Sequence, residues 1–250
     1  MPSHSRPHRV PYLSVALAAA VALGLSGCGT TNTTDKVKSG SAASVTSAAK
    51  AVPSAKVLYD QMRKNVTAAK SVRIKGEITN AGKQMKIDIA GDRDGKNTRA
   101  MMNDGTGGVE LLTAGGNVYI KADAAYWTKN ASAAVAKVAA GKYVKIPAGT
   151  GAGDLKVGAL LDGAFKNLPL AGALQKVEAT DVDGTPAYLL ADKLTPKEGR
   201  IYVSADGKAT LLRIVSTKAN SGTLDFSEWD AVPPTSPPSA HQLVKIPGLG

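Results

Sequence analysis

The sequence predicts an α+β domain built on one large antiparallel sheet of about ten strands. Between residues 71 and 229, apolar side chains recur mainly at every second position, which is the period of a strand with one buried face. Asp-Gly and Gly-Gly pairs separate these segments, and such pairs favour tight turns because they tolerate positive φ. Helical patterns precede the series and interrupt its middle, so we expect helices to cover one face of the sheet.

The first half is expected to be a helix followed by a meander. Ser54 can cap a helix over residues 54–70. The apolar residues of this helix recur at three- and four-residue spacing and are Val57, Leu58, Met62 and Val66. The period then changes to two over residues 72–79, 85–89, 98–102, 109–113 and 117–122. Turn signals near residues 80–82, 94–95, 104–105 and 115–116 separate these segments into antiparallel strands.

The middle of the chain breaks this alternation. We expect an Ala-rich helix over 131–140, a strand over 142–146 and a second helix over 154–167, with an apolar face that holds Leu155, Ala159, Leu160 and Phe165. Strands then resume over residues 174–181, 187–192, 200–204, 210–217 and 222–229. Because the helices are short and rich in small residues, they would fill a curved sheet poorly. An apolar cavity is therefore expected, with a solid core of Val, Ile and Leu as the alternative.

Composition limits the chemistry that the chain can perform. Of the 3 His, two lie near the N-terminus and the third, His241, lies in a Pro-rich end. A His-based triad or a His-containing zinc site is therefore hard to assemble. Residues 92–95 and 181–184 resemble the start of a calcium loop but lack its later ligands. We expect no catalytic residue, no metal and no cofactor, and a protein that is not an enzyme.

The formal net charge of +11 suggests an anionic partner. Nucleic acid is not expected, because the chain has only 2 Phe and 2 Trp for stacking and its lysines are scattered. Anionic lipid headgroups would suit such a surface, and a charged surface that simply keeps the protein soluble is the alternative.

The only cysteine, Cys28, follows an apolar segment near the N-terminus. Residues 1–11 carry Arg6 and Arg9 without an acidic side chain, and residues 12–25 are apolar, as in a secretory signal peptide. The apolar run is shorter than the roughly 20 residues that span a bilayer. Residues 25–28, Leu-Ser-Gly-Cys, resemble the lipobox of bacterial lipoproteins, in which the cysteine becomes the first mature residue and carries a diacylglycerol. An uncleaved membrane helix or a buried core helix is the alternative.

These features divide the chain into four parts. We expect a signal peptide over residues 1–27, a lipid-anchored flexible linker over 28–53, the α+β domain over 54–231 and a Pro-rich C-terminal segment over 232–250. The linker is rich in Ser, Thr, Ala and Lys, and it can bury too little apolar surface to fold. The protein is then expected outside the cytoplasm, held at the outer leaflet of the cell membrane through Cys28.

Residues 52–244 resemble the LppX/LprA/LprF/LprG family of actinobacterial lipoproteins. The segments that carry the resemblance are the strand 71–76 after a short helix, residues 117–121 with 126–129 closing a short loop, and residues 226–229 before the Pro-rich end. The resemblance implies a LolA-like half-barrel with helices across its concave face. It also implies an apolar cavity that binds acylated lipids or glycolipids. The chain departs from the family in its long Pro-rich end and its Ala/Gly-rich middle.

The function expected from these observations is that of a membrane-anchored protein that binds acylated lipid for transport or presentation across the cell envelope. Its partners would be the membrane, through the anchor, the lipid ligand and, as a further candidate, a membrane transporter. The alternative is an adaptor lipoprotein with a filled core that holds a protein partner at the membrane. The residues expected to line the cavity are Val72, Ile74, Met85, Ile87, Ile89, Val118, Ile120, Leu160 and Phe165.

Overall fold

The computed structural model describes residues 52–80, 82–146, 155–166, 174–192, 199–216 and 221–246. These residues belong to the unit Lys50–Gly250, one of two units into which the chain divides. The expected signal peptide, Cys28 and almost all of the expected linker lie outside the described residues. Within the described part of the chain, no helix is both long enough and apolar enough to cross a membrane.

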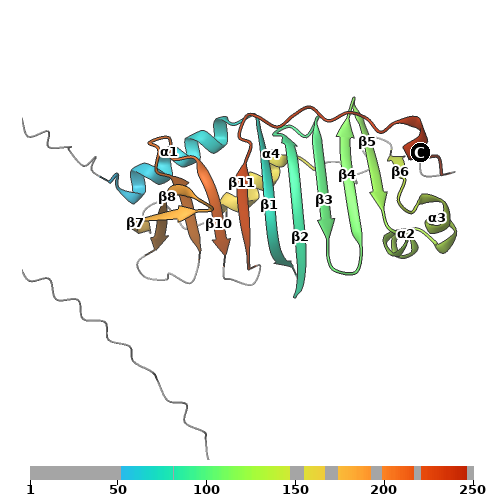
Figure 1. Cartoon of the computed structure of the whole chain (residues 1–250), viewed down its shortest axis with the longest axis horizontal. Helices are drawn as coiled ribbons and strands as arrows, with labels where there is room; N and C mark the ends of the chain where they lie inside the picture. Colours follow the sequence, from blue (N-terminus) through green and yellow to red (C-terminus); the bar gives the residue numbers. More distant parts are fainter. Residues whose placement is uncertain are drawn as a thin grey trace, which may run out of the picture. The chain divides into compact units, whose positions relative to one another are not determined.

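The strands of the described residues form one open 12-stranded sheet in the order β12-β6-β5-β4-β3-β2-β1-β11-β10-β9-β8-β7 (Figure 1). They are β1 Ser71–Asn80, β2 Lys83–Asp92, β3 Thr98–Asn103, β4 Gly108–Ala114, β5 Asn117–Ala122, β6 Tyr143–Ile146, β7 Leu174–Val182, β8 Thr185–Asp192, β9 Arg200–Ser204, β10 Leu211–Ser216, β11 Gly222–Ser227 and β12 Leu243–Val244. Neighbours are antiparallel except β12 and β6, which run parallel. The predicted α+β fold with a large curved sheet is therefore confirmed.

Pairing of β1 with β11 joins the two meanders, β1 to β6 and β7 to β11, into one sheet. Gly76 lies opposite Leu224 in this ladder, and a Cβ at position 76 would lie 1.9 Å from the carbonyl oxygen of Thr223. Gly222 on β11 is equally confined, because its Cβ would lie 2.2 Å from the carbonyl oxygen of Glu77. Only glycine permits so close an approach of two backbones.

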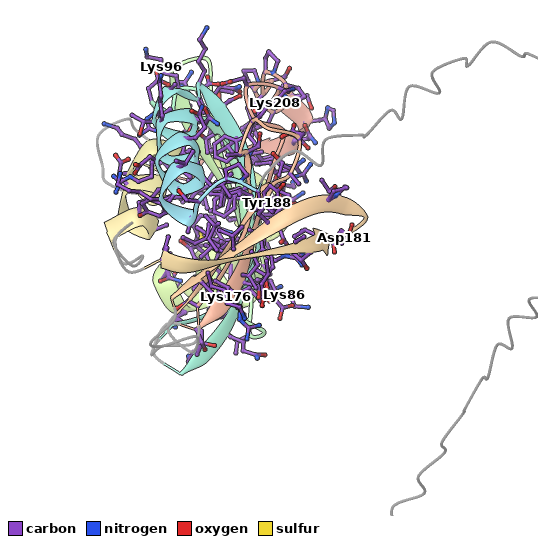
Figure 2. All side chains as sticks on the ribbon, turned by 90° about the vertical axis from the view of Figure 1, so that its left-hand side faces the viewer. Lys86, Lys96, Lys176, Asp181, Tyr188 and Lys208 are labelled. Atoms are coloured by element: carbon purple, nitrogen blue, oxygen red, sulfur yellow. The ribbon has the colours of Figure 1, made fainter. Side chains whose placement is uncertain are left out.

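Two helices cover the part of the sheet around the β1–β11 junction. Helix α1, Ala55–Ala68, begins after Ser54, whose Oγ accepts a hydrogen bond from the Val57 N–H at 3.4 Å. Helix α4, Val157–Lys166, packs Val157 and Leu161 into the same core. The other core members come mainly from α1 and from the inward-facing positions of the strands, and they include Leu58, Met62, Val72, Ile74, Ile89, Leu190, Ile201, Val203, Leu211 and Phe226. Figure 2 shows this layer of side chains between α1 and the sheet.

A second pair of helices covers β5 and β6 at the other end of the sheet (Figure 1). Residues 126–129 were expected in a loop, but they belong to helix α2, Ala124–Asn130. The Asp123 carboxylate caps α2 by accepting from the Tyr126 N–H at 2.8 Å, and this cap makes the short helix possible. Helix α3, Ala133–Ala139, follows after its own cap at Ser132. The helices contribute Trp127, Ala136 and Ala139 to a core with Val118, Ile120, Val144 and Ile146.

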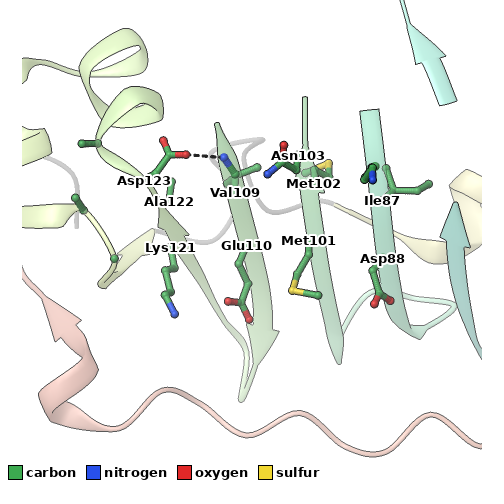
Figure 3. Close-up of a pocket in the computed structure, with 15 residues that line it drawn as sticks. Ile87, Asp88, Met101, Met102, Asn103, Val109, Glu110, Lys121, Ala122 and Asp123 are labelled. Atoms are coloured by element: carbon green, nitrogen blue, oxygen red, sulfur yellow. Dashed lines mark hydrogen bonds between the residues drawn. The ribbon is translucent and has the colours of Figure 1, made fainter. Parts of the chain in front are cut away.

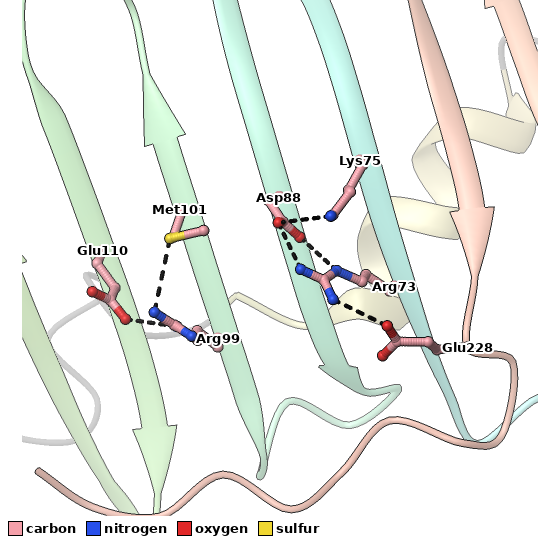
Figure 4. Close-up of polar contacts among 7 residues, drawn as sticks. All are labelled: Arg73, Lys75, Asp88, Arg99, Met101, Glu110 and Glu228. Carbon is pink, nitrogen blue, oxygen red and sulfur yellow. Dashed lines mark hydrogen bonds and ion pairs between the residues drawn. The ribbon is translucent and has the colours of Figure 1, made fainter.

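The opposite face of the sheet carries a row of charged side chains. Arg73 donates to Asp88 at 2.8 Å and to Glu228 at 3.0 Å, and Lys75 lies 3.5 Å from Asp88 (Figure 4). Although burial opposes it, hydrogen bonding to Arg73 holds the pKa of Asp88 below its usual range. Arg99 similarly pairs with Glu110 on the neighbouring strand at 2.7 Å. These cross-strand pairs satisfy the charges on this face within the sheet.

The Pro-rich end, expected as a separate segment, lies along the sheet as far as residue 246. The Val232 N–H donates to Ser71 Oγ at 3.3 Å, and the Thr235 N–H donates to Asn97 Oδ1. A 3-10 turn, η1 Ala240–Gln242, then leads into β12. Leu243 packs there on Tyr143, which belongs to a small apolar cluster on the outer face, and burial raises the pKa of Tyr143 to about 12. The segment thus adds a strand that the alternation pattern did not predict.

Candidate functional site

The two pairs of helices leave the middle of the concave face uncovered. The core under α1 and α4 reaches Ile89 and Ala100, and the core under α2 and α3 begins at Ala122. Between them, Ile87, Met102 and Val109 are only half-buried. These residues lie side by side in register, with Met102 paired to Ile87 on one side and to Val109 on the other. Since paired residues share one face of a sheet, their side chains form an apolar floor.

A pocket of about 730 Å³ lies on this floor (Figure 3). Its lining is mainly apolar, and α2 and the end of α3 bound it through Ala124, Ala140 and Gly141. A second pocket, of about 490 Å³, lies between α2 and the turn that joins β3 to β4. Met102, Asn103 and Val109 line both pockets, so the two pockets adjoin, and we call them together the concave groove. Ligand pockets for small molecules have volumes of about 300–1,000 Å³.

Two carboxylates at the rim of the concave groove are already bonded to the backbone. Asp123 accepts from the Tyr126 N–H at 2.8 Å and from the Gly108 N–H at 2.7 Å, and these bonds hold its pKa below the usual range. Asp104 accepts from the Thr106 hydroxyl at 2.7 Å and from the N–H groups of Thr106 and Gly107. These hydrogen bonds, with a smaller contribution from Lys83, lower the pKa of Asp104. Both groups are therefore ionised and fix the shape of the rim.

The structure distributes the predicted cavity residues over four environments. Met85 and Ile87 line the groove. Val72, Ile74 and Ile89 are buried in the core beneath α1 and α4. Val118 and Ile120 are buried in the core beneath α2 and α3.

The fourth environment is helix α4. Phe165 is half-buried there, and the Arg63 guanidinium of α1 lies 5.8 Å from the centre of its ring. Leu160 points outward and is 37% exposed, while the next residue, Leu161, is 2% exposed. The inward stripe of α4 therefore runs through Val157 and Leu161, which are four residues apart, as one helix face requires. Ligand contact by the nine predicted residues stays a prediction.

Several groove residues escaped the sequence reasoning. Met102 and Val109 continue the alternation of their strands on the face of Ile87, so strand period and register together would have selected them. Asn103, Tyr126 and Lys129 carried no such signal, because the hairpin turn and α2 come together only in the folded chain. Among the described residues, no group of three or more His, Cys, Asp and Glu could hold a metal ion.

No protein-family model matches the chain, and no curated protein matches it. Among solved structures, it is similar to LprF from Mycobacterium bovis, with 16% identity over 74% of this chain and 96% of that one, at a TM-score of 0.44. It is also similar to the lipoprotein LppX from Mycobacterium tuberculosis, with 13% identity over 70% of this chain and 94% of that one, at a TM-score of 0.41. MucB in complex with MucA has 13% identity over 75% of this chain and 58% of that one, at a TM-score of 0.33.

Proposed function

We propose that this protein is a membrane-anchored, non-enzymatic lipid carrier that holds the acyl chains of a lipid in the concave groove. The observation that carries the proposal is the apolar floor of Ile87, Met102 and Val109, which the two pairs of helices leave uncovered. This floor lines a pocket of about 730 Å³. A floor of this kind exposes apolar surface to water unless a ligand covers it.

The energetic need for such a carrier follows from the cost of exposing an acyl chain. A 16-carbon chain in water is disfavoured by on the order of 12 kcal/mol, at about 0.8 kcal/mol per methylene. An acylated lipid therefore leaves a membrane only when an apolar enclosure replaces the bilayer. A groove floored by half-buried side chains of three strands, β2, β3 and β4, and bounded by helices supplies apolar contacts along the chain.

The test is native mass spectrometry of residues 52–250, secreted from an actinobacterial host and purified without detergent. We expect the folded protein to carry additional mass that extraction with organic solvent identifies as acylated lipid. Repeated preparations that are folded by circular dichroism but carry no lipid would contradict the proposal. That outcome would favour the adaptor function, in which the groove serves no ligand.

The proposal places the protein outside the cytoplasm, attached to the outer leaflet of the cell membrane through Cys28. Support comes from the lipobox-like residues 25–28 and from the signal-peptide pattern before them. A thioether-linked diacylglycerol supplies two acyl chains, and two chains anchor stably where one gives only marginal binding. A carrier held in this way stays close to the membrane from which it takes its ligand, and it can pass that ligand to a membrane transporter.

Cys28→Ala is expected to abolish incorporation of radiolabelled palmitate into the protein without changing the folded domain. The chain has no other cysteine, so no second thiol can take the lipid. Incorporation is measured on the immunoprecipitated protein, with Ser26→Ala as a control that keeps the thiol. Equal labelling of wild type and Cys28→Ala would show that the anchor is elsewhere.

A further inference from the structure

The rim of the concave groove between α2 and the β3–β4 turn differs chemically from its floor. The floor is apolar, but the rim carries the side chains of Asn103, Tyr126 and Lys129. Asn103 extends from the end of β3, where it lines both pockets (Figure 3). Tyr126 and Lys129 are three residues apart on α2, so they lie on one face of that helix.

These three side chains present hydrogen-bond donors that the described residues do not use. Asn103 accepts from the Gly105 N–H at 2.7 Å through Oδ1, and its Nδ2 donates to no described residue. The Tyr126 hydroxyl makes no hydrogen bond within the described part of the chain, where the Lys129 ammonium also forms no ion pair. An amide, a phenol and an ammonium group are therefore available to one ligand.

The two carboxylates at the same rim are bonded to their own turn and helix. Asp104 takes three hydrogen bonds on Oδ1, from Thr106 and Gly107, and Asp123 takes one on each oxygen, from Gly108 and Tyr126. Neither carboxylate is paired with Lys129. The rim thus keeps three donor side chains free for a ligand group with several acceptor oxygens, and the Lys129 ammonium matches a negative charge on that group.

We infer that this rim is a headgroup subsite that binds the phosphate of an anionic lipid, with Lys129 and Asn103 as the residues that select it. The inference rests on the proposed function, because it assumes that the acyl chains lie on the apolar floor. Lys129 supplies a positive charge, Asn103 supplies an amide N–H through Nδ2, and the Tyr126 hydroxyl can donate to the same group. A neutral headgroup of the same size would leave the ammonium unpaired.

The experiment compares two lipids that differ only in the headgroup. The full-length chain carrying Cys28→Ala, so that no anchoring acyl chain can enter the groove, is offered equimolar dipalmitoyl phosphatidylglycerol and dipalmitoylglycerol. Native mass spectrometry measures the ratio of the two protein–lipid complexes. We expect phosphatidylglycerol to dominate in this parent chain. Lys129→Ala should lower the ratio by about three- to tenfold, since Lys129 is solvent-exposed and its interaction is screened.

Two further variants separate recognition from folding. Asn103→Asp keeps the oxygen that accepts from Gly105 but replaces the amide N–H with a negative charge, so it should lower the ratio at least as much as Lys129→Ala. Lys137→Ala removes an exposed lysine from α3 that lines neither pocket, and it should leave the ratio unchanged. Binding of both lipids with equal affinity in the parent chain, or an equal loss of both lipids in Lys129→Ala, would overturn the headgroup subsite alone. Failure of both lipids to bind would overturn the carrier function, and the subsite with it.

Discussion

Met102→Trp is expected to lower lipid loading by about tenfold or more while leaving the fold intact. Met102 lies at the centre of the groove floor, lines both pockets and is only half-buried. An indole ring there would project into the space that the acyl chain is proposed to occupy. Exclusion of two methylenes forfeits about 1.6 kcal/mol, which exceeds the 1.4 kcal/mol that corresponds to a tenfold change in affinity. Loading is measured as the lipid-bound fraction by native mass spectrometry.

Val57→Trp is the control for this substitution. Val57 lies on α1, its side chain is 59% exposed, and it lines neither pocket. A comparable gain of bulk at this position should leave the groove open and lipid loading unchanged. Full loading of Met102→Trp would show that the acyl chain does not lie on this floor. A loss in both variants would point to a general effect on the folded domain.

Gly76→Ala is expected to destabilise the domain by about 3 kcal/mol or more. The new Cβ would lie 1.9 Å from the carbonyl oxygen of Thr223 and 3.1 Å from the Cα of Leu224. These are backbone atoms, so no side-chain rotation relieves the clash, and the β1–β11 ladder must separate locally. Because this ladder joins the two halves of the sheet, the loss should reach both halves. Urea unfolding, followed by the fluorescence of Trp127 and Trp229, measures the free energy of unfolding.

Gly116→Ala separates this clash from the conformational cost of replacing a glycine. Gly116 lies in the β4–β5 turn with φ at +73°, and no atom lies within 4 Å of its missing Cβ. Alanine at this position should cost about 1 kcal/mol, the cost of left-handed backbone geometry alone. Equal losses in Gly76→Ala and Gly116→Ala would mean that the β1–β11 ladder relaxes around an added methyl group.

The outer face suggests why the groove forms on the opposite side of the sheet. Ion pairs of Arg73 with Asp88 and of Arg99 with Glu110 occupy the outer positions of the central strands, and the C-terminal segment passes the ends of these strands at Ser71 and Asn97. The concave positions of the same strands are apolar. A groove for an apolar ligand is therefore confined to the concave side, where two separate pairs of helices leave β2 to β4 open.

The strands and most of the helices could be predicted from the sequence because their signals are local. Apolar alternation identified both meanders, and Asp94-Gly95 and Asp104-Gly105 marked real turns, in which Gly95 and Gly105 have φ of +78° and +81°. Ser54 was identified as a helix cap for the same reason, since its partner, Val57, is only three residues away. Helix α2 escaped prediction because its 7 residues are too few to show a helical period and its stability depends on the Asp123 cap and on Trp127 in the core.

The sequence by itself determined the α+β class, the alternation of each strand and the positions of the turns, because backbone dihedral preferences and the two-residue side-chain period act over a few neighbours. Only the tertiary structure decided that β1 pairs with β11, that the Pro-rich end returns to pair with β6, and that Asn103 meets α2 at the groove rim. These contacts join residues far apart in the chain. Their free energy depends on the packing of the whole sheet, and no short segment carries that information.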